Sequence, residues 1–481
     1  MRYMEKENKR KPSFAAAVLP ILVMAVVLGI GFGKYRYSVE VLLLICSFFT
    51  VGLALFYGTT WDEVAASVSE KIGKSFMAIF IFVFVGLIIG TWMLSGTIPM
   101  LIYYGLKLLS PSMFLVSAFI ITVIVSVCTG TSFGSVGTVG LALIGVASGL
   151  GVNPAAAAGA IISGAYFGDK MSPLSDTTNL APVAAGTTLF EHIRHMFYTT
   201  VPASAVCLVV YFIAGRSSSI VSSADSTAAV EMMNGLSEAF QFNPLLLIPL
   251  LIVLVGSAMG KPTIPVMFFA GVVAGILALV FQGATIGSAI TAAFNGFKLS
   301  MLPAVIPEQV PSAVQTLLER GGMTSMMTTV LKVLCAFLFA GAMSAGGFMD
   351  TILNTLKSFV HSDGTLILVT VISTLIVGIV VGNAYIPILL CGELFKDAFK
   401  ERNLDAKNLS RTLEDAGTCV IPLVPWSAGG AYMAGTLGVS TFDYAPWAIF
   451  CYAGFLFAIL WGFTGVGIAK LKPEEKKEMT A

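Results

Sequence analysis

Charged residues and histidine are scarce in this chain. Only 11% of its 481 residues are charged, whereas soluble domains carry about 25%, so a soluble fold is excluded. The three histidines, His192, His195 and His361, stand beside charged or polar loop sequence. We expect them at solvated loop ends, with pH sensing as the alternative role.

Cysteine pairs and nucleotide-binding motifs are also missing from the sequence. The seven cysteines are scattered and form neither a Cys-x-x-Cys pair nor a Cys/His cluster, which argues against zinc and redox chemistry. The sequence lacks Gly-x-x-x-x-Gly-Lys-Ser/Thr, the motif of a nucleotide-driven pump, and 134–137 lacks the spacing of a nucleophile elbow. We therefore expect no enzyme and no cofactor.

Apolar sequence is what the chain has in abundance. Hydrophobic residues make up 57% of it, and the mean hydropathy is +0.90. Several runs reach the roughly 17–25 residues that cross a bilayer, namely 14–32, 39–57, 75–95, 244–260, 264–281 and 444–463. The sequence predicts an all-α polytopic membrane protein.

Basic residues gather before the first apolar run and after the last one. They are Arg2, Lys6, Lys9, Arg10, Lys11, Lys470, Lys472, Lys476 and Lys477. By the positive-inside rule both termini are then cytoplasmic and the number of crossings is even. Because the first run is long and no small-residue cleavage site follows it, we expect a retained helix. The expected location is a cell membrane of the bacterial inner-membrane type.

A Ser-rich stretch divides the chain into two halves. We place the halves at 1–215 and 241–470, an extramembrane linker at 216–240 and a cytoplasmic tail at 471–481. The linker has few Lys and Arg residues, which suits the non-cytoplasmic side. Each half then crosses an odd number of times, which predicts inverted repeats. An offset of 252 residues supports the repeat, because it pairs Gly130 with Gly382, Pro173 with Pro425, Ser175 with Ser427 and Gly186 with Gly438.

Each half has two interruptions in its apolar sequence. They are 128–138 and 168–179 in the first half, and 381–387 and 422–430 in the second. Paired Gly/Pro-interrupted segments indicate a transporter's binding site, since broken backbone at membrane depth must line a cavity or be buried in protein. Close helix packing at glycines is the alternative, but it does not explain prolines beside Asp, Ser, Thr and Asn.

The interruption at 168–179 is the richest in oxygen ligands. Carboxylate, hydroxyl and amide oxygens suit a hard cation such as Na⁺, and they come from Ser175, Asp176, Thr177, Thr178 and Asn179. We expect Na⁺ at Asp176, Ser175 and Asn179. The other interruptions would complete the coordination shell of the ion with oxygen atoms from Thr129, Thr131, Ser132, Asn383 and Ser427.

Proton coupling needs a carboxylate that binds either a proton or the cation. Burial favours the protonated form, whereas a bound cation favours the carboxylate, so the two ions compete. Asp176 is the first candidate and Asp169 the second, with helix capping or charge pairing as the alternative roles. Glu414 and Asp415 form a further acidic pair, which acts as a proton relay or caps a half-helix.

Two cations near these carboxylates bear on the class of substrate. Lys170 and Arg411 would contact a transported organic anion, since anionic substrates favour a positive group at the site. Alternatively, both side chains extend to an aqueous edge of the membrane.

The interrupted segments resemble those of the NhaC family of sodium/proton antiporters. The matching blocks are GTSFGSVGTVG (130–140), GAYFGDKMSPLSDTTNLAP (164–182), EHIRHMFYTT (191–200) and EDAGTCVIPLVPWSAGGAYMAGTLGV (414–439). The resemblance spans both halves. It implies inverted repeats with re-entrant hairpins and broken helices that meet near the midplane, and an exchange of sodium for protons driven by the transmembrane gradient.

The expected partners are the lipid bilayer, Na⁺ and H⁺, and nucleic acid is not among them. The family is similar to exchangers that move organic acids such as malate and lactate. A sodium- and proton-coupled exchanger of a small organic acid or amino acid is therefore the second hypothesis, and a passive channel and a structural membrane protein are further ones. A small organic anion and a second copy of the chain stay open as partners.

Overall fold

The structure is a computed structural model that describes residues 10–35, 37–217 and 226–471. In this part of the chain the regular elements are helices, and the one β contact is an isolated bridge between Leu404 and Lys470. Nine of the described helical segments are long and apolar enough to cross a membrane, or up to eleven if two bent pairs each form one span. The prediction of an all-α polytopic membrane protein is confirmed.

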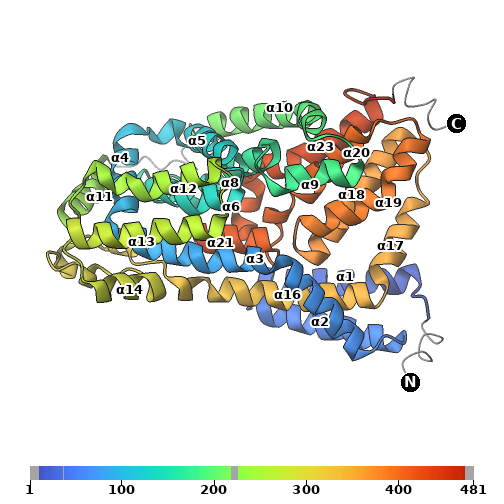
Figure 1. Cartoon of the computed structure of the whole chain (residues 1–481), viewed down its shortest axis with the longest axis horizontal. Coiled ribbons are helices and arrows are strands. Elements are labelled where there is room, and N and C mark those ends of the chain that lie inside the picture. The colour runs from blue at the N-terminus through green and yellow to red at the C-terminus, as the bar shows by residue number, and fades with distance from the viewer. Residues whose placement is uncertain (1–9, 36, 218–225, 472–481) are drawn as a thin grey trace.

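The spanning segments lie mostly along the long axis of the molecule (Figure 1). They are built from α1 (Phe14–Leu28), α2 (Val39–Phe56), α3 (Trp61–Ser95), α5 (Phe114–Thr129), α6 (Ser132–Ser135), α7 (Leu141–Gly149), α10 (Leu189–Ala214), α13 (Thr263–Phe281), α16 (Met327–Ala345) and α18 (Asp363–Val381). The predicted span at 75–95 is the second part of α3, whose 35 residues begin at a capping box of Thr60 and Glu63. At 1.5 Å per residue, α3 is about 52 Å long.

The remaining helices connect these spans, cover them or belong to the two bent pairs. They are α4 (Thr97–Leu108), α8 (Pro154–Met171), α9 (Asp176–Ala185), α11 (Ser226–Ala239), α12 (Ile248–Ala258), α14 (Ile286–Asn295), α15 (Ser312–Leu318), α17 (Phe348–Lys357), α19 (Tyr385–Glu401), α20 (Ala406–Gly417), α21 (Ala428–Leu437), α22 (Thr441–Tyr444) and α23 (Ile449–Thr464). The predicted linker at 216–240 thus contains a helix, α11. The division into halves stays a prediction, and 1–9, 218–225 and the predicted tail beyond 471 lie outside the described residues.

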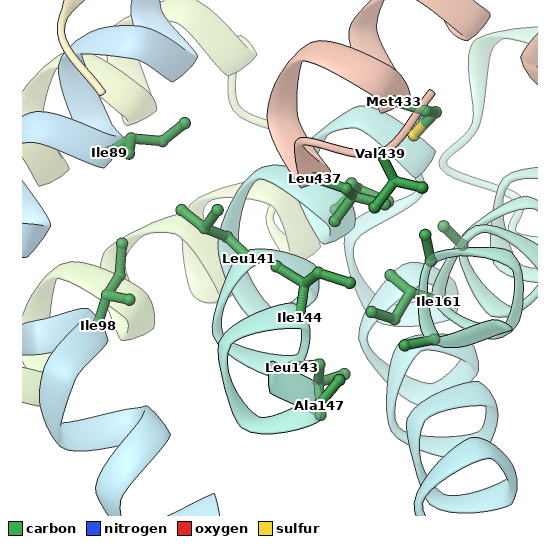
Figure 2. Packing of buried hydrophobic residues seen from close by; sticks show 14 of the residues in the cluster. Ile89, Ile98, Leu141, Leu143, Ile144, Ala147, Ile161, Met433, Leu437 and Val439 are labelled. Atoms are coloured by element: carbon green, nitrogen blue, oxygen red, sulfur yellow. The ribbon is translucent and has the colours of Figure 1, made fainter. Parts of the chain in front are cut away.

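The largest apolar core joins helices from both predicted halves. Leu141 and Ile144 of α7 lie between Ile89 of α3 on one side and Ile161 of α8 on the other, with Leu437 of α21 above them (Figure 2). These side chains are buried, and burial of a Leu or Ile side chain contributes about 1.5–3 kcal/mol. The core therefore fixes α7, α8 and α21, which carry or flank three of the four predicted interruptions.

Glycine allows α5 and α8 to approach each other closely. A Cβ atom at Gly164 would lie 2.4 Å from the Phe119 carbonyl oxygen, and one at Gly168 would lie 2.3 Å from the Ser126 Cβ. Asn153 begins α8 by accepting hydrogen bonds from two backbone amides of its first turn. The helix ends at Met171, before Ser172 and Pro173, where the chain turns towards α9. The last turn of α8 is thereby held against the end of α5.

Positions related by the offset of 252 residues have similar local structure. Gly130 and Gly382 each end a helix in the left-handed conformation, with φ of +69° and +71°. The Val127 carbonyl accepts a hydrogen bond from Ser172, and the offset-related Ile379 carbonyl accepts one from Trp426, two residues beyond the position related to Ser172. Two further pairs match as well, because Ser175 and Ser427 precede α9 and α21, and Gly186 and Gly438 follow them. The inverted orientation of the two repeats stays a prediction.

Replacing Gly130 by alanine should destabilise the protein. The left-handed conformation costs a non-glycine residue about 1–2 kcal/mol, and the new Cβ would lie 2.5 Å from the Leu174 Cβ. We expect Gly130→Ala to melt at a lower temperature than wild type in detergent, measured by size-exclusion chromatography after heating. Gly52→Ala is the matched control, because a Cβ there meets nothing within 4 Å inside α2. Equal melting of both variants would contradict this view of the turn.

Candidate cation site

The four interruptions meet around one cavity. Its volume is about 420 Å³, and it lies where α5 and α18 end and α9 and α21 begin. Its wall includes Thr129, Gly130, Thr131, Ser132, Asp169, Asp176, Thr177, Asn383, Tyr385, Ala428 and Gly429. Segments that are about 250 residues apart in sequence therefore share one polar space.

Asp169 is the carboxylate at the centre of a hydroxyl cluster. It lies in the last turn of α8, where the Ser132 hydroxyl donates to its Oδ2 at 2.6 Å and the Ser175 hydroxyl donates to its Oδ1 at 2.7 Å. The Thr178 hydroxyl donates to the main-chain oxygen of the same residue at 2.7 Å. Short hydrogen bonds to a carboxylate are the strong ones. The hydroxyls of Ser132 in α6 and Ser175 at the start of α9 thus hold the Asp169 carboxylate in one orientation at the cavity wall.

Asp176 lies at the same cavity in a more open position. It is the first residue of α9 and is exposed, and the Tyr385 hydroxyl lies 3.5 Å from its Oδ2. A negative charge is favourable at a helix N-terminus. Among the described residues, Asp176 is less enclosed by hydrogen-bond donors than Asp169.

The other predicted ligands divide into cavity residues and residues that stabilise the chain breaks. Thr131, Thr177 and Asn383 line the cavity. Asn179, in contrast, donates from its amide to the carbonyls of Pro173 and Ser175, at 2.8 and 2.7 Å. Ser427 donates to the Val424 carbonyl and accepts from the Gly430 amide. Asn179 and Ser427 therefore hold the turns before α9 and α21.

Several cavity residues are absent from the sequence prediction. Tyr166 stands one helical turn before Asp169, and Thr418 stands one turn after Glu414. Tyr385 belongs to a predicted interruption, so its aromatic hydroxyl was a usable signal. Ser75 of α3 and Lys261, between α12 and α13, come from regions without an interruption pattern.

Comparison with known proteins identifies the family. The model of the Na⁺/H⁺ antiporter family matches residues 164–466, which include three of the four interruptions. The chain belongs to this family. The family prediction made from the sequence is confirmed.

Relatives of this antiporter family match the chain over most of its length. An uncharacterized Na⁺/H⁺ antiporter of Haemophilus influenzae is 47% identical, over 96% of this chain and 98% of the relative. The Na⁺/H⁺ antiporter NhaC of Alkalihalophilus pseudofirmus is 38% identical over 96% and 98%. A malate-2H⁺/Na⁺-lactate antiporter of Bacillus subtilis is 35% identical over 89% of both chains. The protein is thus a multi-pass membrane transporter, not an enzyme.

A buried ion pair lies behind the cavity of this family member. Lys170, next to Asp169 in sequence, contacts Asp415 of α20, and both side chains are fully buried. Thr199 of α10 hydrogen-bonds to both of them at 3.2 Å. Arg411 donates to the Gly467 carbonyl at 2.9 Å. Neither Lys170 nor Arg411 is among the described residues that line the cavity, where the cationic side chain is Lys261.

The histidine prediction was wrong for two of the three residues. His192 and His195 are buried in α10 rather than placed at solvated loop ends. His192 pairs through Nδ1 with the Ser410 hydroxyl at 2.6 Å, and His195 pairs through Nε2 with Asn408 Oδ1 at 3.1 Å. Both partners lie on α20, a polar helix whose residues 408–417 are all buried. In this antiporter family protein, α20 thus provides a hydrogen-bond partner for one ring nitrogen of each histidine, while His192 Nε2 has no partner among the described residues.

Removing the Ser132 hydroxyl should weaken sodium binding by this antiporter family protein. The variant removes an oxygen that lies 2.6 Å from the Asp169 carboxylate, and the loss of one polar contact to a charged group costs about 1.5–3 kcal/mol, or about 10- to 100-fold in affinity. We expect Ser132→Ala to raise the sodium concentration at half-maximal transport by that factor. Ser204→Ala is the control, because Ser204 bonds to the Thr200 carbonyl of its own helix. An unchanged half-maximal concentration in Ser132→Ala would contradict the assigned contact.

Proposed function

We propose that the protein exchanges sodium for protons across the cell membrane, with Asp169 as the group that both ions share. The observation that carries this proposal is the position of the Asp169 carboxylate among hydroxyls at the cavity where the four chain breaks meet. Membership of the Na⁺/H⁺ antiporter family supports the same ions.

The cavity offers the ligands that sodium prefers. A hard cation takes carboxylate, hydroxyl, amide and carbonyl oxygens. Asp169 supplies the negative charge, and the hydroxyl oxygens of Ser132 and Ser175 lie 2.6 and 2.7 Å from its carboxylate. A hydroxyl can turn its hydrogen away and present a lone pair, so the two serines can bind the cation together with the carboxylate.

Competition at one carboxylate couples the two ions. With a proton bound, Asp169 has no charge to attract a cation. With sodium bound, protonation is opposed by the cation's charge. The cavity must open alternately to the two sides of the membrane. Exchange follows if Asp169 always carries either a proton or a sodium ion when the cavity switches sides.

Asp176 supports the exchange from the cavity mouth. It is exposed, while Asp169 is half-buried, and both carboxylates line the same space. A second negative charge at the mouth raises the local concentration of cations. The geometry therefore favours Asp169 as the shared group and Asp176 as the residue that attracts and passes on the cation, the reverse of the order expected from the sequence.

A coupled exchanger of an organic acid or amino acid is the second candidate. The cavity of about 420 Å³ is large beside the roughly 30 Å³ that one water occupies in the liquid, so sodium alone does not fill it. One relative is a malate-2H⁺/Na⁺-lactate antiporter. In this case the solute would share the cavity with the cation.

A proteoliposome assay with a pH-sensitive dye inside the vesicles tests the proposal and separates the two candidates. We expect external sodium to drive proton movement with no organic solute present, and potassium to drive less. If movement requires malate, lactate or an amino acid, the second candidate holds. If no ion or solute moves protons, both candidates are wrong. Flux that rises without saturation and without proton countertransport would indicate a channel.

A further inference from the structure

Glu414 is a buried carboxyl group without an ion-pair partner in contact among the described residues. It lies on α20, its side chain is fully buried, neither of its oxygens makes a close hydrogen bond, and its polar neighbours are the hydroxyls of Thr418 and Thr177. Buried charges in proteins are normally paired or bound to a cation. The site proposed above does not use Glu414, so its environment requires a separate explanation.

Two fully buried cations are placed near this part of α20, and Lys170 is already paired, while Arg411 of α20 donates to the Gly467 carbonyl. Lys170 contacts Asp415, the residue after Glu414, and Thr199 hydrogen-bonds to both. A Cβ at Gly454 would lie 2.7 Å from Asp415 Oδ1 and 3.4 Å from Lys170 Nζ, so α23 closes this pair on another side. The ion pair is thus enclosed, and Lys170 contacts Asp415, although its positive charge also acts on Glu414 without direct contact.

An unpartnered hydroxyl connects Glu414 with the cavity. Thr418 follows Glu414 by four residues, which places the two side chains on one side of the chain as α20 ends. The Thr418 hydroxyl is buried, lines the cavity and makes no hydrogen bond to a described residue. Thr177 of α9 lines the same wall, and the hydroxyls of Thr177 and Thr418 both interact with the Glu414 carboxyl group. Glu414, which is not among the described cavity residues, therefore lies behind two hydroxyls of the cavity wall.

We propose that Glu414 and Thr418, with the hydroxyl of Thr177, form a second binding site for a hard monovalent cation such as Na⁺ or Li⁺. The set contains one carboxylate and two hydroxyls, which are the ligands of such ions. It is distinct from the Asp169 site, where Ser132 and Ser175 already bond to the two carboxylate oxygens. The bound cation supplies the direct contact that Lys170 makes with Asp415 and not with Glu414.

The inference rests on the proposed function only in that sodium enters the cavity. It adds a consequence that a single shared carboxylate does not have. With two cation sites on one cavity, the chain binds two sodium ions at saturation.

Equilibrium binding of ²²Na⁺ to purified full-length protein tests the second site. We expect wild type to bind two Na⁺ per chain, and Glu414→Gln and Asp169→Asn to bind one each. A variant with both substitutions should bind none. If Glu414→Gln binds as many sodium ions as wild type, the second site does not exist and Glu414 holds a proton or no ion.

Thr418 provides a test that keeps the carboxylate in place. Thr418→Val removes the hydroxyl at nearly constant volume and should weaken the second sodium about 10-fold, whereas Thr418→Ser should restore it. Thr436→Val is the matched control, because Thr436 is another buried hydroxyl without a described partner but is not among the described cavity residues. An equal loss of affinity for the second sodium ion in Thr418→Val and Thr436→Val would indicate a packing effect and overturn the assignment. Sodium binding by Thr418→Val that matches wild type would also overturn it.

The two proposals fail in different ways. If wild type binds no sodium, the proposed function is wrong. If it binds one sodium that is lost in Asp169→Asn and kept in Glu414→Gln, the proposed function holds and the second site is wrong. Melting temperature without sodium, compared between wild type and each variant, identifies a variant that has simply lost its fold.

Discussion

Asp169→Asn should lower sodium-driven proton movement by about 100-fold or more, which corresponds to about 2.7 kcal/mol or more. The amide keeps the size of the side chain but removes the charge that binds sodium and the oxygen that accepts a transported proton. It also places an N–H₂ group opposite the hydroxyls of Ser132 or Ser175, which now donate to the carboxylate. The initial rate in proteoliposomes with an internal pH dye measures the effect.

Two other aspartates serve as comparisons for this variant. Asp176→Asn should lose less, about 3- to 10-fold, because an exposed charge acts through screened attraction rather than as the shared group. Asp443→Asn should transport like wild type, because Asp443 is exposed and is not among the described cavity residues. If Asp169→Asn moves protons at the normal rate and Asp176→Asn does not, Asp176 is the group shared by both ions and the roles given to the two residues are wrong.

Lys170→Met should destabilise the protein by about 3–5 kcal/mol, because removing one partner leaves an uncompensated buried charge on Asp415. Both side chains are fully buried, and the Lys170 ammonium also lies 5.4 Å from the centre of the Phe450 ring. The thermal melting point in detergent, or unfolding in mixed micelles, measures the loss. Replacing both partners, as Lys170→Met with Asp415→Leu, should recover much of it, since an apolar pair of similar volume is tolerated.

An exposed ion pair provides the control for Lys170. Lys74 and Glu70 on α3 are 61% and 64% exposed, and such pairs contribute about 0–1 kcal/mol. Lys74→Met should therefore melt close to wild type. If Lys170→Met and Lys74→Met behave alike, the buried pair has no special part in stabilising the interior around α8, α10, α20 and α23.

Much of the fold could be predicted from the sequence because its main signals are local. Long apolar runs indicate spans whatever their neighbours are, and Gly130 and Gly382 mark helix ends because a left-handed residue is needed there. The offset of 252 residues pairs turns that do have the same local structure. The length of α3 was underestimated, because the charged residues before Ser75 resemble a loop although they continue the helix.

The candidate site was harder to predict because contacts far apart in sequence decide it. The identity of Asp169 as the enclosed carboxylate depends on Ser132, 37 residues away. The polarity of α20 suggests an exposed helix, yet its residues 408–417 are buried because α10, α18, α19 and α23 surround it. Lys170 resembles an anion contact until Asp415, 245 residues away, is seen to pair with it. No local pattern carries such information.

Proton release on sodium binding is the most direct test of a carboxylate shared by both ions. Purified protein in weakly buffered detergent solution, at a pH where the free site binds a proton, should acidify the solution when sodium chloride is added. Choline chloride should give no such change, and Asp169→Asn should release fewer protons than wild type. Sodium binding without proton release in wild type, or undiminished release in Asp169→Asn, would contradict competition at Asp169.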